Sequence, residues 1–166
     1  MKRVRSYERE PTPLHQGVDD PRMLLKRVDY LTDEKSRVLD VMKRVVIDYN
    51  KTFQKPQRVA LRLHQTRTTF AALLWRKTYN GRQAFFKLFD EDDEQQRGAR
   101  ILAESSTNEQ LVYVDYERQR LLLNTQATAL HSEFKACRLA LNDYWSLNDY
   151  LKRTRLYEHV TDASPR

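Results

Sequence analysis

The chain has 166 residues, of which 40% are apolar and 32% are charged, and its formal net charge is +7. This length predicts one domain with a true hydrophobic core. The single cysteine, Cys137, excludes an intramolecular disulfide framework and a cysteine-based zinc cluster, and no apolar run is long enough to span a membrane. No apolar stretch follows the basic start of the chain, so we expect no secretory signal and a cytoplasmic protein.

Residues 1–19 are predicted to form a basic flexible arm. They carry Lys and Arg at four positions, are interrupted by Pro11, Pro13 and Gly17, and show no hydrophobic period. Such an arm can order on a polyanionic partner. The alternative is a tail that packs loosely on the domain.

A long amphipathic helix is predicted over about 21–53. Asp20 is a good N-cap, and Pro21 is tolerated at the first helical position. Lys35 is the single polar residue in the stripe, and residues 32–34 could instead begin a second helix. Apolar residues recur at steps of three and four, which is one helical face: Leu24, Val28, Leu31, Val38, Met42, Val45 and Tyr49.

The segment 49–89 contains no Asp or Glu. The formal charge is +2 for residues 1–48, +9 for 49–89 and −4 for 90–166, so the positive balance arises in this segment. A segment of one sign makes a local field that attracts polyanions. Its nine basic residues are Lys51, Lys55, Arg58, Arg62, Arg67, Arg76, Lys77, Arg82 and Lys87.

The same segment is predicted to form a three-stranded antiparallel β-meander. Apolar and polar residues alternate over 58–64, which is typical of a half-buried strand. Asn80-Gly81 between two apolar-rich runs is a strong hairpin signal, because a type I′ turn needs positive φ at both central residues. A helix over 57–79 is the alternative, since the apolar run there also suits a helix. The expected strands are about 57–64, 69–79 and 82–89.

The acidic cluster at 90–94 has two interpretations. Clustered carboxylates can bind a divalent cation, but the spacing of a calcium loop is absent. The other interpretation is a solvated loop that precedes a short helix over about 92–103. The cluster could also dock on the basic segment.

A second long helix is predicted over about 109–155, with Thr107 or Asn108 as its cap. Such a helix is too long for a compact globule, so it must pair with the first helix or with another chain. Asn148 is the kind of polar residue that fixes register in a coiled coil. The seam follows a heptad spacing through Leu123, Ala127, Leu130, Phe134, Cys137, Leu141, Tyr144, Asn148 and Leu151.

These elements predict an α+β, mainly helical fold. Two long antiparallel, coiled-coil-like helices would carry the small β-meander inserted between them. The expected organisation is an arm at 1–19, one helical domain at 20–157 with the meander at about 57–89, and a tail at 158–166.

No catalytic constellation emerges from the sequence. The four histidines share no metal-binding spacing, and three glycines cannot build a glycine-rich phosphate cradle. Cys137 lies on the heptad seam, which favours a core position over a nucleophile. We therefore expect a non-enzymatic protein with no metal and no cofactor.

The pattern favours a nucleic-acid-binding or accessory protein. Basic side chains on the meander and on the N-terminal arm would contact DNA or RNA phosphates, and Trp75 or Tyr79 would stack on bases. The predicted site comprises Lys55, Arg58, Arg62, His64, Arg67, Trp75, Arg76, Lys77, Arg82 and Lys87.

The alternative is a protein-interaction adaptor whose basic face meets an acidic partner. Its active surface would be the surplus seam of the second helix, which could also support self-association. The residues concerned are Tyr144, Trp145, Leu147 and Leu151.

Overall fold

The computed structural model describes residues 21–53, 57–66, 70–79, 82–89 and 97–154. The predicted arm, the Asn80-Gly81 turn, the acidic cluster at 90–94 and the tail at 158–166 lie outside the described residues. The chain forms two compact units, one of residues 29–136 and one of the described parts of 1–28 and 137–166.

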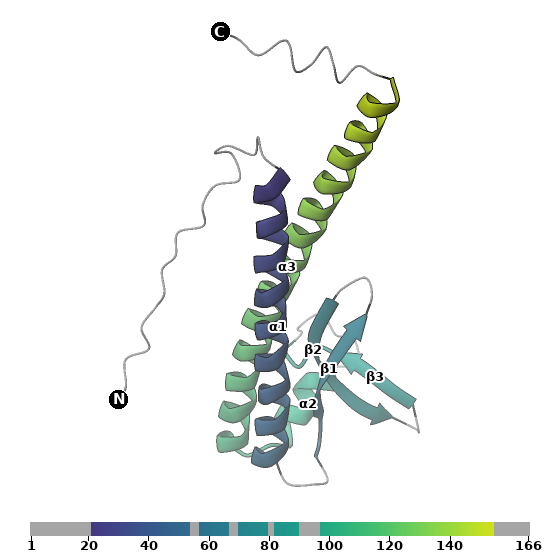
Figure 1. Ribbon diagram of the computed structural model, residues 1–166. Coiled ribbons are helices and arrows are strands. Elements are labelled where there is room, and N and C mark those ends of the chain that lie inside the picture. The colour runs from purple at the N-terminus through teal and green to yellow at the C-terminus, as the bar shows by residue number, and fades with distance from the viewer. Residues whose placement is uncertain (1–20, 54–56, 67–69, 80–81, 90–96, 155–166) are drawn as a thin grey trace, which may run out of the picture. The chain divides into compact units, whose positions relative to one another are not determined.

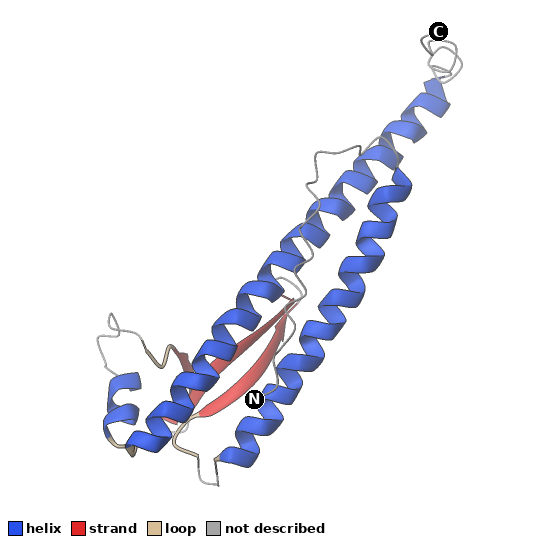
Figure 2. Cartoon of the chain, turned by 90° about the vertical axis from the view of Figure 1, so that its left-hand side faces the viewer, coloured by secondary structure: helices blue, strands red, loops and turns tan. Residues whose placement is uncertain are grey.

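The fold is α+β and mainly helical, as the sequence predicts. In chain order the elements are α1 (Pro21–Thr52), β1 (Ala60–Thr66), β2 (Phe70–Tyr79), β3 (Arg82–Phe86), α2 (Arg97–Ala103) and α3 (Thr107–Thr154) (Figure 1). The alternative helix over 57–79 is excluded, because β1 and β2 occupy that segment. Helix α1 runs without a break through residues 32–34. Figure 2 shows the strands alongside the two long helices.

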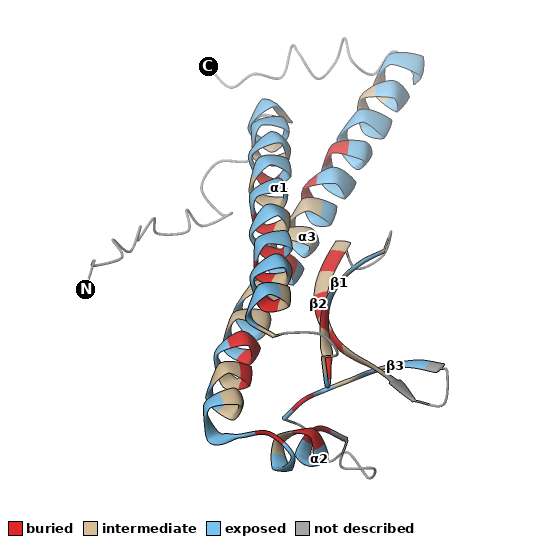
Figure 3. Cartoon of the chain, turned by 90° about the horizontal axis from the view of Figure 1, so that it is seen from below, coloured by how far each residue is buried: buried red, intermediate tan, exposed pale blue. Residues whose placement is uncertain are grey.

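Helices α1 and α3 run antiparallel within the unit of residues 29–136. Lys35 near the start of this stretch of α1 lies by His131, with 3.4 Å between Nζ and Nδ1. Thr52 at the end of α1 lies by Tyr116, with 3.0 Å between the two hydroxyl oxygens. The predicted stripe of α1 faces inward, and its buried members are Leu31, Val38, Met42, Val45 and Tyr49 (Figure 3).

Lys35, the polar residue in this stripe, lies among aromatic rings. Its Nζ is 4.0 Å from the ring centroid of Phe134 and 4.5 Å from that of Phe70. Burial, and then the charge of Lys135, lower the pKa of Lys35. The cation–π contacts compensate for the lost hydration, so the charge is tolerated in an otherwise apolar seam.

The sheet has the order β1-β2-β3, and both pairs of strands are antiparallel. Leu61 pairs with Trp75, and Trp75 pairs with Phe86. Directly paired residues project to the same face, so these side chains and that of Leu73 form the inner face against the helices. Leu61, Leu73 and Trp75 are fully buried.

A side chain of α3 completes the edge of β2. Strand β3 pairs with β2 only from Trp75 onward, so it does not reach Leu73. Asn124 fills this position: its Oδ1 accepts from the Leu73 N–H at 2.7 Å, and its Nδ2 donates to the Leu73 carbonyl at 3.0 Å. Asn124 therefore takes the place of a strand for both backbone groups of Leu73, and Arg120 Nη1 donates to the same carbonyl at 3.5 Å.

Trp75 is a core residue, which corrects the expectation that it stacks on a base. Its indole Nε1 donates to Glu117 Oε2 at 2.6 Å. Arg120 binds the same carboxylate through Nε and Nη2, each at 2.7 Å. The rings of Tyr49 and Tyr113 pack edge-on against Trp75. Because side chains alternate along β2, this inward tryptophan fixes the outward position of the next residue.

The start of α3 is capped by Ser106, which corrects the expected cap at Thr107 or Asn108. The Glu109 carboxylate accepts from the Ser106 N–H at 2.8 Å, and the Glu109 N–H donates to Ser106 Oγ at 3.3 Å. This reciprocal arrangement is a capping box. Hydrogen bonds from the Ser106 backbone and hydroxyl lower the pKa of Glu109.

Candidate nucleic-acid interface

The outer face of the sheet carries the exposed basic residues. Val59 and Leu61 are buried, whereas the alternating residues Arg58, Arg62 and His64 are exposed. This confirms the predicted division of β1 into an apolar and a basic face.

The strand register extends this basic face across the sheet. Ala60 pairs with Arg76, and Arg76 pairs with Phe85. Arg62 pairs with Leu74 on the same face. The outer face thus places Arg62 and Arg76 on neighbouring strands, although they are far apart in the sequence.

Four cationic side chains line one pocket of about 240 Å³ at the start of β1. Strand β1 begins at Ala60, opposite Arg76. Lys77 pairs with Ala84 of β3 and alternates to the side of Trp75, but it also lines this pocket, where the pairing of β1 with β2 ends. The complete lining is Gln57, Arg58, Val59, Ala60, Arg62, Arg76 and Lys77.

The three arginines of this pocket are poorly neutralised among the described residues. Arg58 Nη1 lies 3.3 Å from Glu104 Oε2, and their side chains are 42% and 67% exposed, so water screens the pair. Across the described parts of the chain, the guanidinium groups of Arg62 and Arg76 form no hydrogen bond and no ion pair. A guanidinium group has the fork geometry that matches an anionic ligand such as phosphate.

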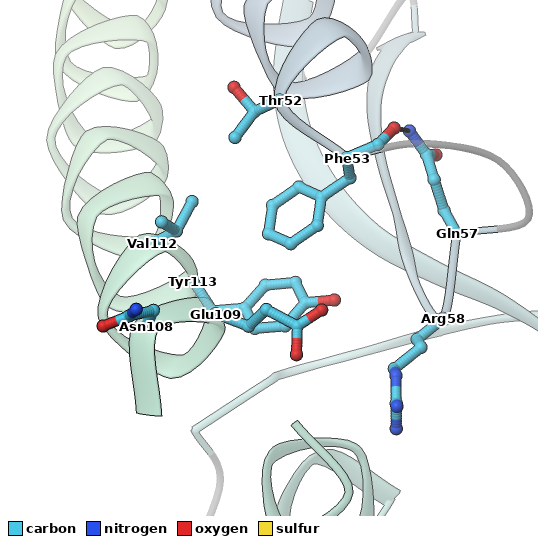
Figure 4. Close-up of a pocket in the computed structure, with 8 residues that line it drawn as sticks. All are labelled: Thr52, Phe53, Gln57, Arg58, Asn108, Glu109, Val112 and Tyr113. Carbon is cyan, nitrogen blue, oxygen red and sulfur yellow. Dashed lines mark hydrogen bonds between the residues drawn. The ribbon is translucent and has the colours of Figure 1, made fainter. Parts of the chain in front are cut away.

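A second pocket of about 450 Å³ shares Gln57 and Arg58 with the cationic one. Figure 4 shows it between the end of α1 and the start of α3. The rings of Phe53 and Tyr113 stack in it with centroids 4.7 Å apart. The carboxylate of Glu109 also lines this pocket, which makes it a poorer place for phosphate than the cationic pocket.

The remaining predicted nucleic-acid-binding residues are distributed differently. His64 is exposed on β1, with its ring centroid 5.6 Å from that of Phe85, and Lys87 is exposed after β3. Arg82 begins β3, but its side chain is outside the described part of the structure, as is the side chain of Tyr79. Lys55 and Arg67 lie outside the described residues. The structure thus brings Arg58, Arg62, Arg76 and Lys77 together at one pocket. Trp75 is buried in the core and is not part of this surface.

Phe85 is an exposed aromatic residue that the predicted site does not include. Phe85 is 47% exposed, whereas Phe86 packs against the core. Two consecutive phenylalanines in a strand must point to opposite faces. The sequence therefore contained the signal that one ring is exposed, but only the register identifies which one.

The predicted protein-interaction residues lie in the C-terminal part of α3. Tyr144, Trp145 and Leu147 are 40%, 50% and 55% exposed, and Leu151 is half-buried. Tyr150, which the sequence did not single out, is 54% exposed beside them.

Comparison of the chain with protein-family models, with curated proteins and with solved structures finds no significant match. Among the described residues, no helix has an apolar stretch long enough to cross a membrane. Within the same residues, no group of three or more His, Cys, Asp or Glu side chains is placed to hold a metal ion.

Proposed function

We propose that this protein is a non-enzymatic nucleic-acid-binding or accessory protein that contacts phosphates through the outer face of its sheet. The observation that carries the proposal is the convergence of Arg58, Arg62, Arg76 and Lys77 on one pocket. These residues come from two strands and the segment before them, so the fold concentrates charge that the sequence spreads over 20 residues. We place this function in the cytoplasm.

The electrostatic surroundings support phosphate as the ligand. Segment 49–89 has no carboxylate of its own. The buried carboxylate of Glu117, which touches the sheet through Trp75, is on the opposite face and is neutralised by Arg120. A phosphate on the outer face therefore meets cations without a competing acid on the same strands.

The test is fluorescence anisotropy with labelled single- and double-stranded oligonucleotides over a series of salt concentrations. The test variant is Arg62→Ala/Arg76→Ala. The control is Arg44→Ala/Arg118→Ala, which removes the same charge from exposed positions on α1 and α3. Circular dichroism checks that both variants are folded.

We expect wild-type binding to strengthen steeply as salt falls, because phosphate contacts release counterions. Loss of two contacts should reduce the slope of log K against log salt by about 1.4 for a single strand or about 1.8 for a duplex. The control should keep the wild-type slope. No binding at low salt by a folded wild-type protein would refute the proposal.

A protein-interaction adaptor is the second candidate, favoured by the exposed apolar residues near the end of α3. Trp145 and Leu147 are half or more exposed on this helix. Light scattering after size exclusion tests self-association of the full chain. If wild type is a dimer and Trp145→Ala/Leu147→Ala is a monomer, this candidate is supported. If wild type is a monomer, the chain does not self-associate through this surface.

A further inference from the structure

We propose that the outer face of the sheet binds single-stranded nucleic acid, with unpaired bases stacked on Phe85 and His64 beside the arginines that hold phosphates. This inference rests on the proposed function and adds to it the class of ligand. Its evidence is the placement of two exposed rings among the cations of the same face.

The first step concerns Phe85. A phenylalanine that is 47% exposed on a strand leaves apolar surface in water. Its neighbour Phe86 already supplies the ring that β3 contributes to the core. Phe85 is therefore not needed in the core, and nearly half of its surface is accessible to a ligand.

The second step concerns the partner ring. The centroids of His64 and Phe85 are 5.6 Å apart, and the ring planes meet at 60°. His64 comes from β1 and Phe85 from β3, so the two rings meet across the middle strand. Leu74 of that strand points to the same face, because it pairs with Arg62. Together these side chains make a platform of two rings with an apolar floor.

The third step concerns the spacing of rings and charges. Arg62 is two residues before His64 on β1, which places them about 7 Å apart along one face. Arg76 is paired directly with Phe85. Each ring therefore has an arginine residue near it on the same face, so a base on the ring would bring its own or the adjacent phosphate toward that arginine.

This arrangement favours a single strand over a duplex. The bases of a duplex are stacked and paired with each other, so an exposed ring on a sheet cannot reach their faces. Unpaired bases of DNA and RNA both offer a π-face to aromatic side chains. A face that combines rings with arginines, on strands that carry no carboxylate of their own, thus matches single-stranded nucleic acid better than an acidic protein, which has no bases to stack.

The experiment compares wild type, Phe85→Ala and Phe85→Trp in binding to oligo-dT, oligo-U, a duplex, and an abasic strand of the same length and charge. The matched control is Tyr150→Ala, which removes an exposed ring from α3. Phe85 lies on the exposed face of an edge strand, so both substitutions at this position should leave the fold intact.

We expect Phe85→Ala to weaken single-strand binding by about five- to 150-fold, the range for loss of one stacked base. Its salt slope should equal that of wild type, because no charge is removed. Phe85→Trp should restore binding. The abasic strand should bind wild type and Phe85→Ala with equal affinity, because it has no base to stack on the Phe85 ring.

The outcomes separate this inference from the proposed function. Salt-dependent binding that Arg62→Ala/Arg76→Ala weakens but Phe85→Ala leaves unchanged would overturn the stacking platform and keep the phosphate site. A preference for duplex would overturn it in the same way. If wild type binds none of these ligands at low salt, the proposed function and this inference both fail.

Discussion

Substitution of Glu117 by leucine should strongly destabilise the unit of residues 29–136. The Glu117 and Arg120 side chains are each 11% exposed, and the carboxylate also accepts the indole N–H of Trp75. The change leaves a guanidinium without its bidentate partner and a buried indole N–H without an acceptor. Removal of one member of a buried ion pair lowers the free energy of unfolding by about 3–5 kcal/mol. The indole N–H left without an acceptor accounts for about 1–3 kcal/mol of this loss.

Urea denaturation followed by circular dichroism measures this effect. With a slope of about 2 kcal/mol per molar urea, a loss of about 4 kcal/mol lowers the midpoint by about 2 M. The matched control is Asp115→Leu, because Asp115 is an exposed acid on the same helix. This control should change the free energy of unfolding by no more than about 0.5 kcal/mol.

A double variant tests the cause. Glu117→Leu/Arg120→Met removes the orphaned cation as well as the acid, so it should recover most of the lost stability. The indole N–H of Trp75 would still lack an acceptor, which limits the recovery. A loss below about 1 kcal/mol in Glu117→Leu would refute the reasoning, because it would mean that water reaches this network in solution.

Two further predictions concern the sheet edge and pH. Asn124→Leu should cost about 1–3 kcal/mol and speed hydrogen exchange at the Leu73 amide, because the Leu73 N–H loses its acceptor and the Leu73 carbonyl keeps only the longer bond from Arg120. Unchanged exchange at Leu73 would contradict this role. Burial raises the pKa of Tyr49 and Tyr113, so unfolding releases protons above pH about 10, where free tyrosine ionises, and stability should fall as pH rises further. Tyr49→Phe should be about 1 kcal/mol less stable at pH 7, because the Tyr49 hydroxyl no longer donates to the Val59 carbonyl. Above pH 10 the stability of this variant should fall less steeply than that of wild type. If urea denaturation gives both proteins the same dependence of stability on pH, Tyr49 does not titrate on unfolding.

The elements themselves were predictable because their signals are local. The three-four spacing from Leu31 to Tyr49 specifies one buried helical face wherever the helix packs. Alternation over 58–64 fixes which residues of β1 face the core, so the outward direction of Arg62 and His64 followed from the sequence. The absence of acid from 49–89 likewise belongs to the sequence and needed no structure.

The direction of β2 was decided by tertiary structure. Leu73, Leu74 and Trp75 are consecutive and apolar, so alternation alone permits either set to point inward. Pairing of Trp75 with Leu61 settles this, because Leu61 already faces the core. The same register turns Arg76 outward.

The groups that hold the sheet in place also depended on the fold. Nothing in the sequence marks Glu117, Arg120 or Asn124 as partners of β2, because they follow the β2 residues that they contact by 42 residues or more. Their roles come from the antiparallel return of α3, which presents polar side chains to an unfinished strand edge and to a buried indole. Local periodicity thus determined the helices, the meander and the charge of this protein. Tertiary structure decides which ring is buried and which cations share a pocket, because both depend on contacts between residues that are far apart in the sequence.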